Sequence, residues 1–187
     1  MTDFEFLALV VAIPLGLALV EIAQGLSTAL RRRETIRIGW LTPLLALIIL
    51  VHIGTAWFSL WKIRESFELS LETLQIGIFL AVLFYLTASF VFPDDPKPGT
   101  DLDDWFFRHR VFALGGTFAL LLAFRFFMGD AFVRFADQDT VGRQIEYVLG
   151  WSLRPAFVLL ALFATQKRTV IAAMAILALL FVLWAVI

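Results

Sequence analysis

Six long apolar runs, separated by short charged or proline-rich stretches, make up most of this 187-residue sequence. A helix needs about 20 residues to cross ~30 Å of hydrocarbon, and the runs are close to that length. The pattern predicts an all-α, polytopic integral membrane protein in which residues 1–187 form one transmembrane domain. The expected spans cover approximately residues 4–30, 38–61, 74–92, 111–128, 147–165 and 169–187.

The composition agrees with this class of protein. Hydrophobic residues make up 61% of the chain and charged residues 17%, against about 45–50% and about 25% in soluble domains. A net charge of −1 leaves no basic surface for nucleic acid, so we expect a lipid bilayer and no nucleic acid among the partners. With no cysteine, the chain forms no disulfide, thiolate metal site or iron–sulfur cluster.

The distribution of basic residues predicts that both termini lie on the outer, periplasmic side. In that orientation the cytoplasmic connections are the more basic, as the positive-inside rule requires, and tryptophans fall at the span ends. The cytoplasmic set is Arg31, Arg32, Arg33, Arg37, Lys97, Arg108, Arg110, Lys167 and Arg168, and the outer set is Lys62, Arg64, Arg134 and Arg143. The make-up of the chain is typical of small multi-span proteins of the bacterial inner membrane, which is the location that we expect.

Two connections carry further predictions. The stretch PDDPKPGTDLDD, residues 93–104, divides three spans from three, and its aspartates suit the cap of a helix beginning near Trp105. An odd number of spans per half is the arrangement of inverted-repeat transporters, although the halves share no visible sequence similarity. After the fourth span, Phe132, Phe135 and Ala136 have helical spacing, which fits either a short interfacial helix or a solvated loop.

Ionisable residues inside the spans are the candidate functional groups. Glu21, with Gln24 beside it, lies about 15 Å before Arg31 along the first span. A carboxylate within hydrocarbon costs at least ~2.5–3.5 kcal/mol on insertion scales, so we expect it to have a partner. Arg154 in the fifth span, followed by Pro155, is the predicted partner.

Other residues are expected to support this pair. Tyr85 and Ser89, one turn apart in the third span, would complete a hydrogen-bonded cluster. The face of the first span that carries Glu21 also carries small or polar residues, which predicts a helix contact there. These residues are Pro14, Ala18, Gly25 and Thr28.

A second cluster is predicted in the outer half of the membrane. His52, Thr55 and Ser59 share one face of the second span, and Arg125 of the fourth span lies at a similar depth. We expect these four side chains to line an outer vestibule. A lone histidine also occurs as a hydrogen-bonded packing residue, and the Glu–Arg pair also has a purely structural interpretation, in which it fixes helix register.

Small residues predict close packing of two spans. Gly115, Ala119 and Ala123 follow one another at intervals of four residues in the fourth span, which suits a tight helix contact. The sixth span has no charged residue and carries a row of alanines beginning at Ala172. It faces either lipid or a subunit interface.

Enzymatic chemistry is not expected. The chain contains two histidines and no cysteine, which leaves little from which to build a nucleophile–base or metal constellation. Phosphate-binding loops and the hydrolase and metalloprotease motifs are absent from the sequence. We expect no cofactor and no metal.

The leading hypothesis is therefore a homo-oligomeric channel or small transporter for ions or protons. In it, protonation of Glu21 would break the Glu21–Arg154 pair and open a path. The alternative is a non-catalytic structural or assembly subunit of a larger membrane complex. Short connections and the apolar sixth span favour that alternative.

Overall fold

The structure, a computed structural model, is helical throughout the part of the chain that it describes. It describes residues 2–65, 67–135 and 141–186, and the side chains of 2–65, 67–126 and 152–183. Six helices are present: α1 (Asp3–Arg31), α2 (Leu41–Lys62), α3 (Leu71–Ser89), α4 (Leu102–Phe135), α5 (Val141–Phe163) and α6 (Lys167–Val186). The described ranges contain no strand, which confirms the all-α prediction.

Four helical segments within the described residues are long and apolar enough to cross a membrane. They are α1, α2, α3 and the part of α4 from Leu102 to Phe126. In α5 the described segment Ser152–Phe163 is apolar but shorter. These helices support the membrane class, whereas six crossings and the outer position of the termini remain predictions.

The fourth predicted span is longer in the structure than in the prediction. Helix α4 begins at Leu102 rather than at Val111, because the Asp101 carboxylate accepts hydrogen bonds from the backbone N–H groups of Asp103 (2.8 Å) and Asp104 (3.4 Å) and caps the helix.

At its other end α4 continues to Phe135 without interruption. The backbone of Phe132 and Phe135 therefore belongs to α4, and the prediction of a separate interfacial helix is wrong for these two residues. Ala136, the third residue of that prediction, lies outside the described residues.

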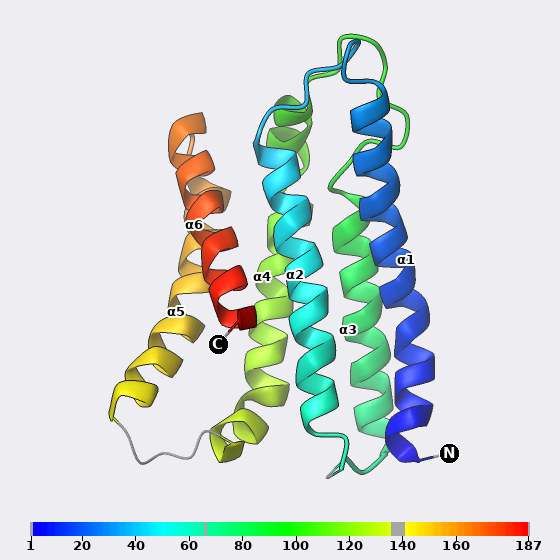
Figure 1. The fold of residues 1–187 in the computed structure, drawn as a ribbon, viewed down its shortest axis with the longest axis vertical. Helices are drawn as coiled ribbons and strands as arrows, with labels where there is room; N and C mark the ends of the chain where they lie inside the picture. The colour runs from blue at the N-terminus through cyan, green and yellow to red at the C-terminus, as the bar shows by residue number, and fades with distance from the viewer. Residues whose placement is uncertain (1, 66, 136–140, 187) are drawn as a thin grey trace.

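Helices α1 and α3 lie side by side and run in the same direction (Figure 1). Near the start of both helices, a Cβ atom added at Gly77 would lie 2.9 Å from Leu7 Cδ1. Near their ends, a Cβ atom added at Gly25 would overlap the ring of Phe92. Ala18, between these two points, is fully buried. The predicted contact face of the first span thus packs at Ala18 and Gly25, and its neighbour is α3.

The remaining helices pack mainly on one another. Helix α2 lies against α6 and α4, and α5 lies against α6 and α4. The close approach of α4 to α3 occurs at Gly116, where an added Cβ atom would overlap Thr87 Oγ1, whereas one added at Gly115 meets nothing within 4 Å. Ala119 is exposed. The predicted packing row is therefore wrong at Gly115 and Ala119, whereas Ala123 packs against the core. The adjacent Gly116 makes the close contact.

The loops 32–40 and 90–101 lie together at one end of the bundle, at the top of Figure 1, which we call the arginine-rich end. Their backbones pair: the Arg37 N–H donates to Thr100 O and the Leu102 N–H to Arg37 O, both at 2.9 Å. The Gly99 N–H donates to Thr35 O at 2.8 Å. The segment after α1 is thereby joined to the segment before α4. The opposite end, where α1 begins, we call the amino-terminal end.

A buried carboxylate connects three helices at the arginine-rich end. Asp103, in the first turn of α4, accepts hydrogen bonds at Oδ1 from the Trp40 N–H (3.1 Å) and the Leu41 N–H (3.0 Å), at the start of α2. Its Oδ2 lies 2.8 Å from Nζ of Lys167, the first residue of α6. Gly39 has φ +66°, and a Cβ atom there would overlap the carboxylate. Asp103 therefore caps α2 rather than its own helix, while Asp101 caps α4.

Replacing Asp103 tests how much this connection stabilises the fold. We expect Asp103→Ala to lower the free energy of unfolding by about 2 kcal/mol, because α2 loses its cap and two backbone N–H groups, one of them buried, lose their acceptor. The Lys167 contribution is smaller because that side chain is 45% exposed. The measurement is equilibrium unfolding in detergent micelles. The exposed neighbour Asp104 supplies the control, and equal losses in Asp103→Ala and Asp104→Ala would contradict the assignment.

Candidate functional site

His52 occupies the middle of α2 and the interior of the bundle. In α2 the buried positions Leu45, Ile49, His52 and Ala56 recur at intervals of three or four residues, so the histidine lies on the face that packs against the other helices. Its side chain is 4% exposed. The imidazole nitrogens make no hydrogen bond with the described residues.

Three phenylalanines from three helices surround the imidazole ring. Phe84 of α3 meets it edge to face with a centroid distance of 5.0 Å. Phe181 of α6 lies at 5.0 Å and Phe124 of α4 at 5.8 Å. Such separations are typical of favourable aromatic pairs. His52 is therefore held by ring packing rather than by polar neighbours.

Arg154 of α5 lies next to the same aromatic cluster. It is 6% exposed, and its Cζ atom lies 5.0 Å from the centroid of the Phe181 ring, a cation–π geometry. Pro155 follows it inside the helix and removes one backbone donor. The Phe181 ring thus contacts both His52 and Arg154, and we call these two residues the His52–Arg154 centre.

The predicted pairing of Glu21 with Arg154 is wrong. In the part of the chain that the structure describes, helix α1 makes no contact with α5, and Figure 1 shows the two helices on opposite sides of the bundle. Glu21 is half-buried and forms no hydrogen bond or ion pair with the described residues. Gln24 is exposed. The gate that was expected from this pair has no counterpart in the fold.

The residues expected to support that pair do not join it either. The Ser89 hydroxyl donates to Leu86 O of its own helix at 2.8 Å. Tyr85 is half-buried against the apolar core and forms no hydrogen bond with the described residues. Among the described side chains, no polar cluster therefore forms around Glu21.

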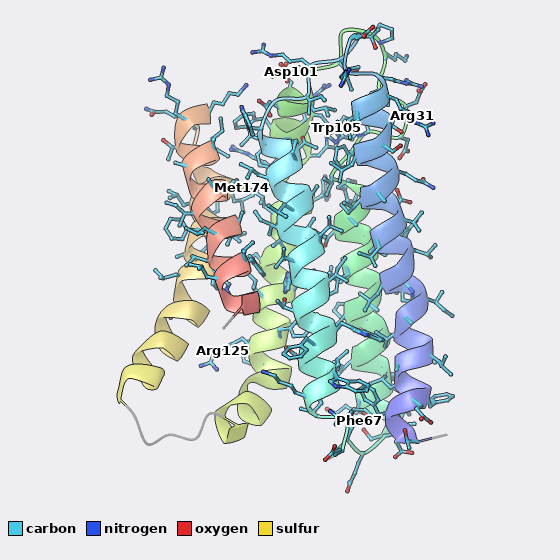
Figure 2. All side chains as sticks on the ribbon, in the orientation of Figure 1. Arg31, Phe67, Asp101, Trp105, Arg125 and Met174 are labelled. Atoms are coloured by element: carbon cyan, nitrogen blue, oxygen red, sulfur yellow. The ribbon has the colours of Figure 1, made fainter. Side chains whose placement is uncertain are left out.

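The predicted outer vestibule is only partly assembled. The Thr55 hydroxyl donates to His52 O (2.9 Å) and the Ser59 hydroxyl to Thr55 O (2.8 Å), so both are satisfied along their own helix. Arg125 is exposed, and Figure 2 shows it on the side of α4 toward α5. The adjacent Phe124 is the α4 residue that faces His52. The structure thus groups His52 with Arg154 and separates it from Arg125.

The His52–Arg154 centre offers no metal site. No group of three His, Cys, Asp or Glu side chains in the described residues is arranged to hold a metal ion. The two side chains are suited to ion binding, hydrogen bonding and proton exchange. Arginine supplies a fixed positive charge, and imidazole is the side chain that most readily gains and loses a proton near neutral pH.

Comparisons with known proteins add no further constraint, because no family model matches the sequence and no curated protein or solved structure is significantly similar to it.

The phenylalanines around His52 were not singled out from the sequence. The chain has 20 phenylalanines, and Phe84, Phe124 and Phe181 come from three separate helices. Within α6 the buried positions Val170, Met174, Leu177 and Phe181 recur at intervals of three or four residues, which assigns Phe181 to a core face. That periodicity does not indicate which residue it meets.

Phe181→Leu tests whether the ring holds the centre together. We expect the free energy of unfolding to fall by about 1–2 kcal/mol, because one aromatic pair and one cation–π contact are lost while most apolar volume is kept. Unfolding in detergent is the measurement. Phe79→Leu, at an exposed position of α3, is the matched control. An unchanged stability in Phe181→Leu would argue against a structural role for the ring.

Proposed function

We propose that the protein is a homo-oligomeric channel or small transporter for ions or protons, with the His52–Arg154 centre as its intramembrane site. The observation that carries this proposal is the burial of a histidine on α2 and an arginine on α5 that both contact the ring of Phe181. Ionisable residues in the interior of a membrane bundle are costly, and such residues commonly line ion or proton pathways.

Arg154 and His52 have different roles in the proposed site. Arg154 provides a permanent positive charge, the kind of group that lines anion-selective pores. His52 provides an imidazole whose nitrogens can donate and accept hydrogen bonds along the proposed path. Pro155 weakens the helix next to Arg154, which favours local movement of α5 during passage.

The proposal includes the membrane in which the protein lies and its orientation there. We place the protein in the bacterial inner membrane with both termini outside, on the strength of the basic connections. In that orientation the arginine-rich end faces the cytoplasm.

Flux measurements in reconstituted vesicles test the site. We expect His52→Gln and Arg154→Gln each to reduce proton or chloride flux about tenfold or more, equivalent to ~1.4 kcal/mol of barrier. Proton flux is followed with an internal pH dye and chloride flux with a chloride-sensitive dye. We expect Arg154→Lys to retain more flux than Arg154→Gln because it keeps the charge.

The second histidine supplies the control. His109 lies at the arginine-rich end, where its ring stacks on Trp105 and Nδ1 lies 3.0 Å from Trp105 O. His109→Gln should leave the flux unchanged. Equal flux in wild type, His52→Gln and Arg154→Gln would reject the proposed site.

A second candidate function is a non-catalytic subunit of a larger membrane complex. The face of α1 that is exposed on the surface of the bundle favours it. Glu21 is one turn before Gly25, which packs on Phe92 just beyond the end of α3, so Glu21 lies level with the last turn of α3. Leu17, Val20 and Gln24 are exposed on this helix. A half-exposed carboxylate at that depth is best accommodated by a polar group on another chain.

Substitution of Glu21 tests this second candidate. We expect Glu21→Leu to weaken association roughly three- to tenfold, the effect of losing ~0.6–1.4 kcal/mol of interhelical hydrogen bonding. Association is measured in vesicles by energy transfer between labelled chains and, for foreign subunits, by pulldown from native membranes with intact-mass analysis. Glu72→Leu, at the exposed start of α3, is the control. Unaltered association in Glu21→Leu would exclude α1 as the interface.

A further inference from the structure

A cavity of about 330 Å³ lies between α1, α2 and α3, in the half of the bundle nearer the amino-terminal end. Leu7, Val11 and Leu15 form its α1 wall, and Ala56 and Leu60 belong to its α2 wall. Its volume is within the range of small-molecule sites, ~300–1,000 Å³. The cavity is partly open to the surroundings of the protein.

The lining is polar at one end only. Glu68 and Thr73 lie at the amino-terminal end, whereas Phe84 and Phe124 close the end at the middle of the bundle. From Thr73 to Phe84 the α3 helix rises about 16 Å, which is about half of the ~30 Å hydrocarbon thickness. The cavity therefore matches one bilayer leaflet in length, with its polar end toward the head groups.

Aromatic side chains stand beside the polar end. Phe4 packs edge to face on Trp61 (6.1 Å) and on Phe67 (6.4 Å), and the Leu69 N–H donates to the Asp3 carboxylate at 3.0 Å. Figure 2 shows Phe67 at this end of the bundle. Tryptophan is enriched at the membrane interface, and Trp61 is the ring that carries this signal here. The polar end of the cavity thus lies at head-group level.

We propose that this cavity binds one acyl chain of a phospholipid from the adjacent leaflet, with the amine of a phosphatidylethanolamine head group near Glu68. Around helices in a bilayer the solvent is hydrocarbon, so an apolar cavity open to it favours an acyl chain, whereas an apolar lining gives water few hydrogen-bond partners. The exposed carboxylate of Glu68 favours a cationic amine over the uncharged glycerol of phosphatidylglycerol. The proposal does not depend on transport by the His52–Arg154 centre.

Photo-crosslinking with phosphatidylethanolamine that carries a diazirine at the end of one acyl chain tests this site. The full chain is reconstituted in mixed phosphatidylethanolamine and phosphatidylglycerol vesicles, and the adducts are mapped by mass spectrometry. We expect adducts to concentrate on lining residues near the middle of the bundle, Leu80, Phe84 and Phe124. Adducts distributed only over lipid-facing positions such as Phe79 would overturn the proposal.

Cavity-filling variants sharpen the test. Ala81 lines the cavity from α3, and we expect Ala81→Phe to reduce the adducts at Phe84 several-fold. Ala56→Leu, a smaller change on α2, should have the same effect if Ala81→Phe does not fold. Ala12→Phe, on the exposed side of α1, is the matched control and should leave the adducts unchanged. Undiminished labelling in a folded filled variant would overturn the site.

Two further measurements separate other occupants. The chain has no cysteine, so Leu80→Cys introduces a single thiol, which should resist a membrane-impermeant methanethiosulfonate reagent. Rapid reaction of this thiol would show a water-filled cavity and overturn the proposal.

The head-group assignment predicts stronger labelling by phosphatidylethanolamine than by the matched phosphatidylglycerol probe, with the difference lost in Glu68→Gln. Equal labelling by the two probes would overturn that assignment.

Discussion

At the arginine-rich end, the carboxylate of Asp103 holds together the first turns of three helices. It lies on α4, accepts two backbone hydrogen bonds at the start of α2, and forms an ion pair with the first residue of α6. A negative charge at helix amino termini is stabilised by the partial positive charge there. With 4% of its side chain exposed, this carboxylate would be unfavourable without these partners, so the three helix ends are fixed to one another.

The position of the His52–Arg154 centre follows from this common origin. His52 lies about 16 Å along α2 from Leu41, and Phe181 lies about 21 Å along α6 from Lys167. Because both helices begin beside the Asp103 carboxylate, the two residues lie within about one helical turn of the same depth, and their rings meet. A short connection joins α5 to α6, and the two helices pack against each other. This packing brings Arg154 of α5 into contact with Phe181 of α6. A polar centre in the middle of the bundle thus depends on an interaction at its end.

The polar groups inside the helices divide between two environments. His52 and Arg154 are enclosed by the bundle, whereas Glu21 lies at the edge of the α1–α3 pair, on the far side from α5. Between them, Phe84 and Phe124 contact His52 and also close the end of the apolar cavity. The same two rings therefore separate a charged centre from a space suited to hydrocarbon. The proposed lipid chain and the proposed ion site would therefore occupy neighbouring parts of the bundle without mixing their environments.

The sequence by itself determined the helices and most of their ends. Backbone groups in hydrocarbon must form hydrogen bonds within a helix, so each long apolar run becomes a helix of about its own length. Local caps such as Thr2 and Ser70 determine where helices begin. The sequence did not determine which helices and side chains contact each other. Helix α1 packs on α3, Asp103 caps a helix 62 residues away in sequence, and Glu21 and Arg154 lie far apart. Only the tertiary structure decided these contacts, because lipid-facing and protein-facing apolar surfaces are alike in composition, and helix pairing depends on side-chain shape at many distant positions at once.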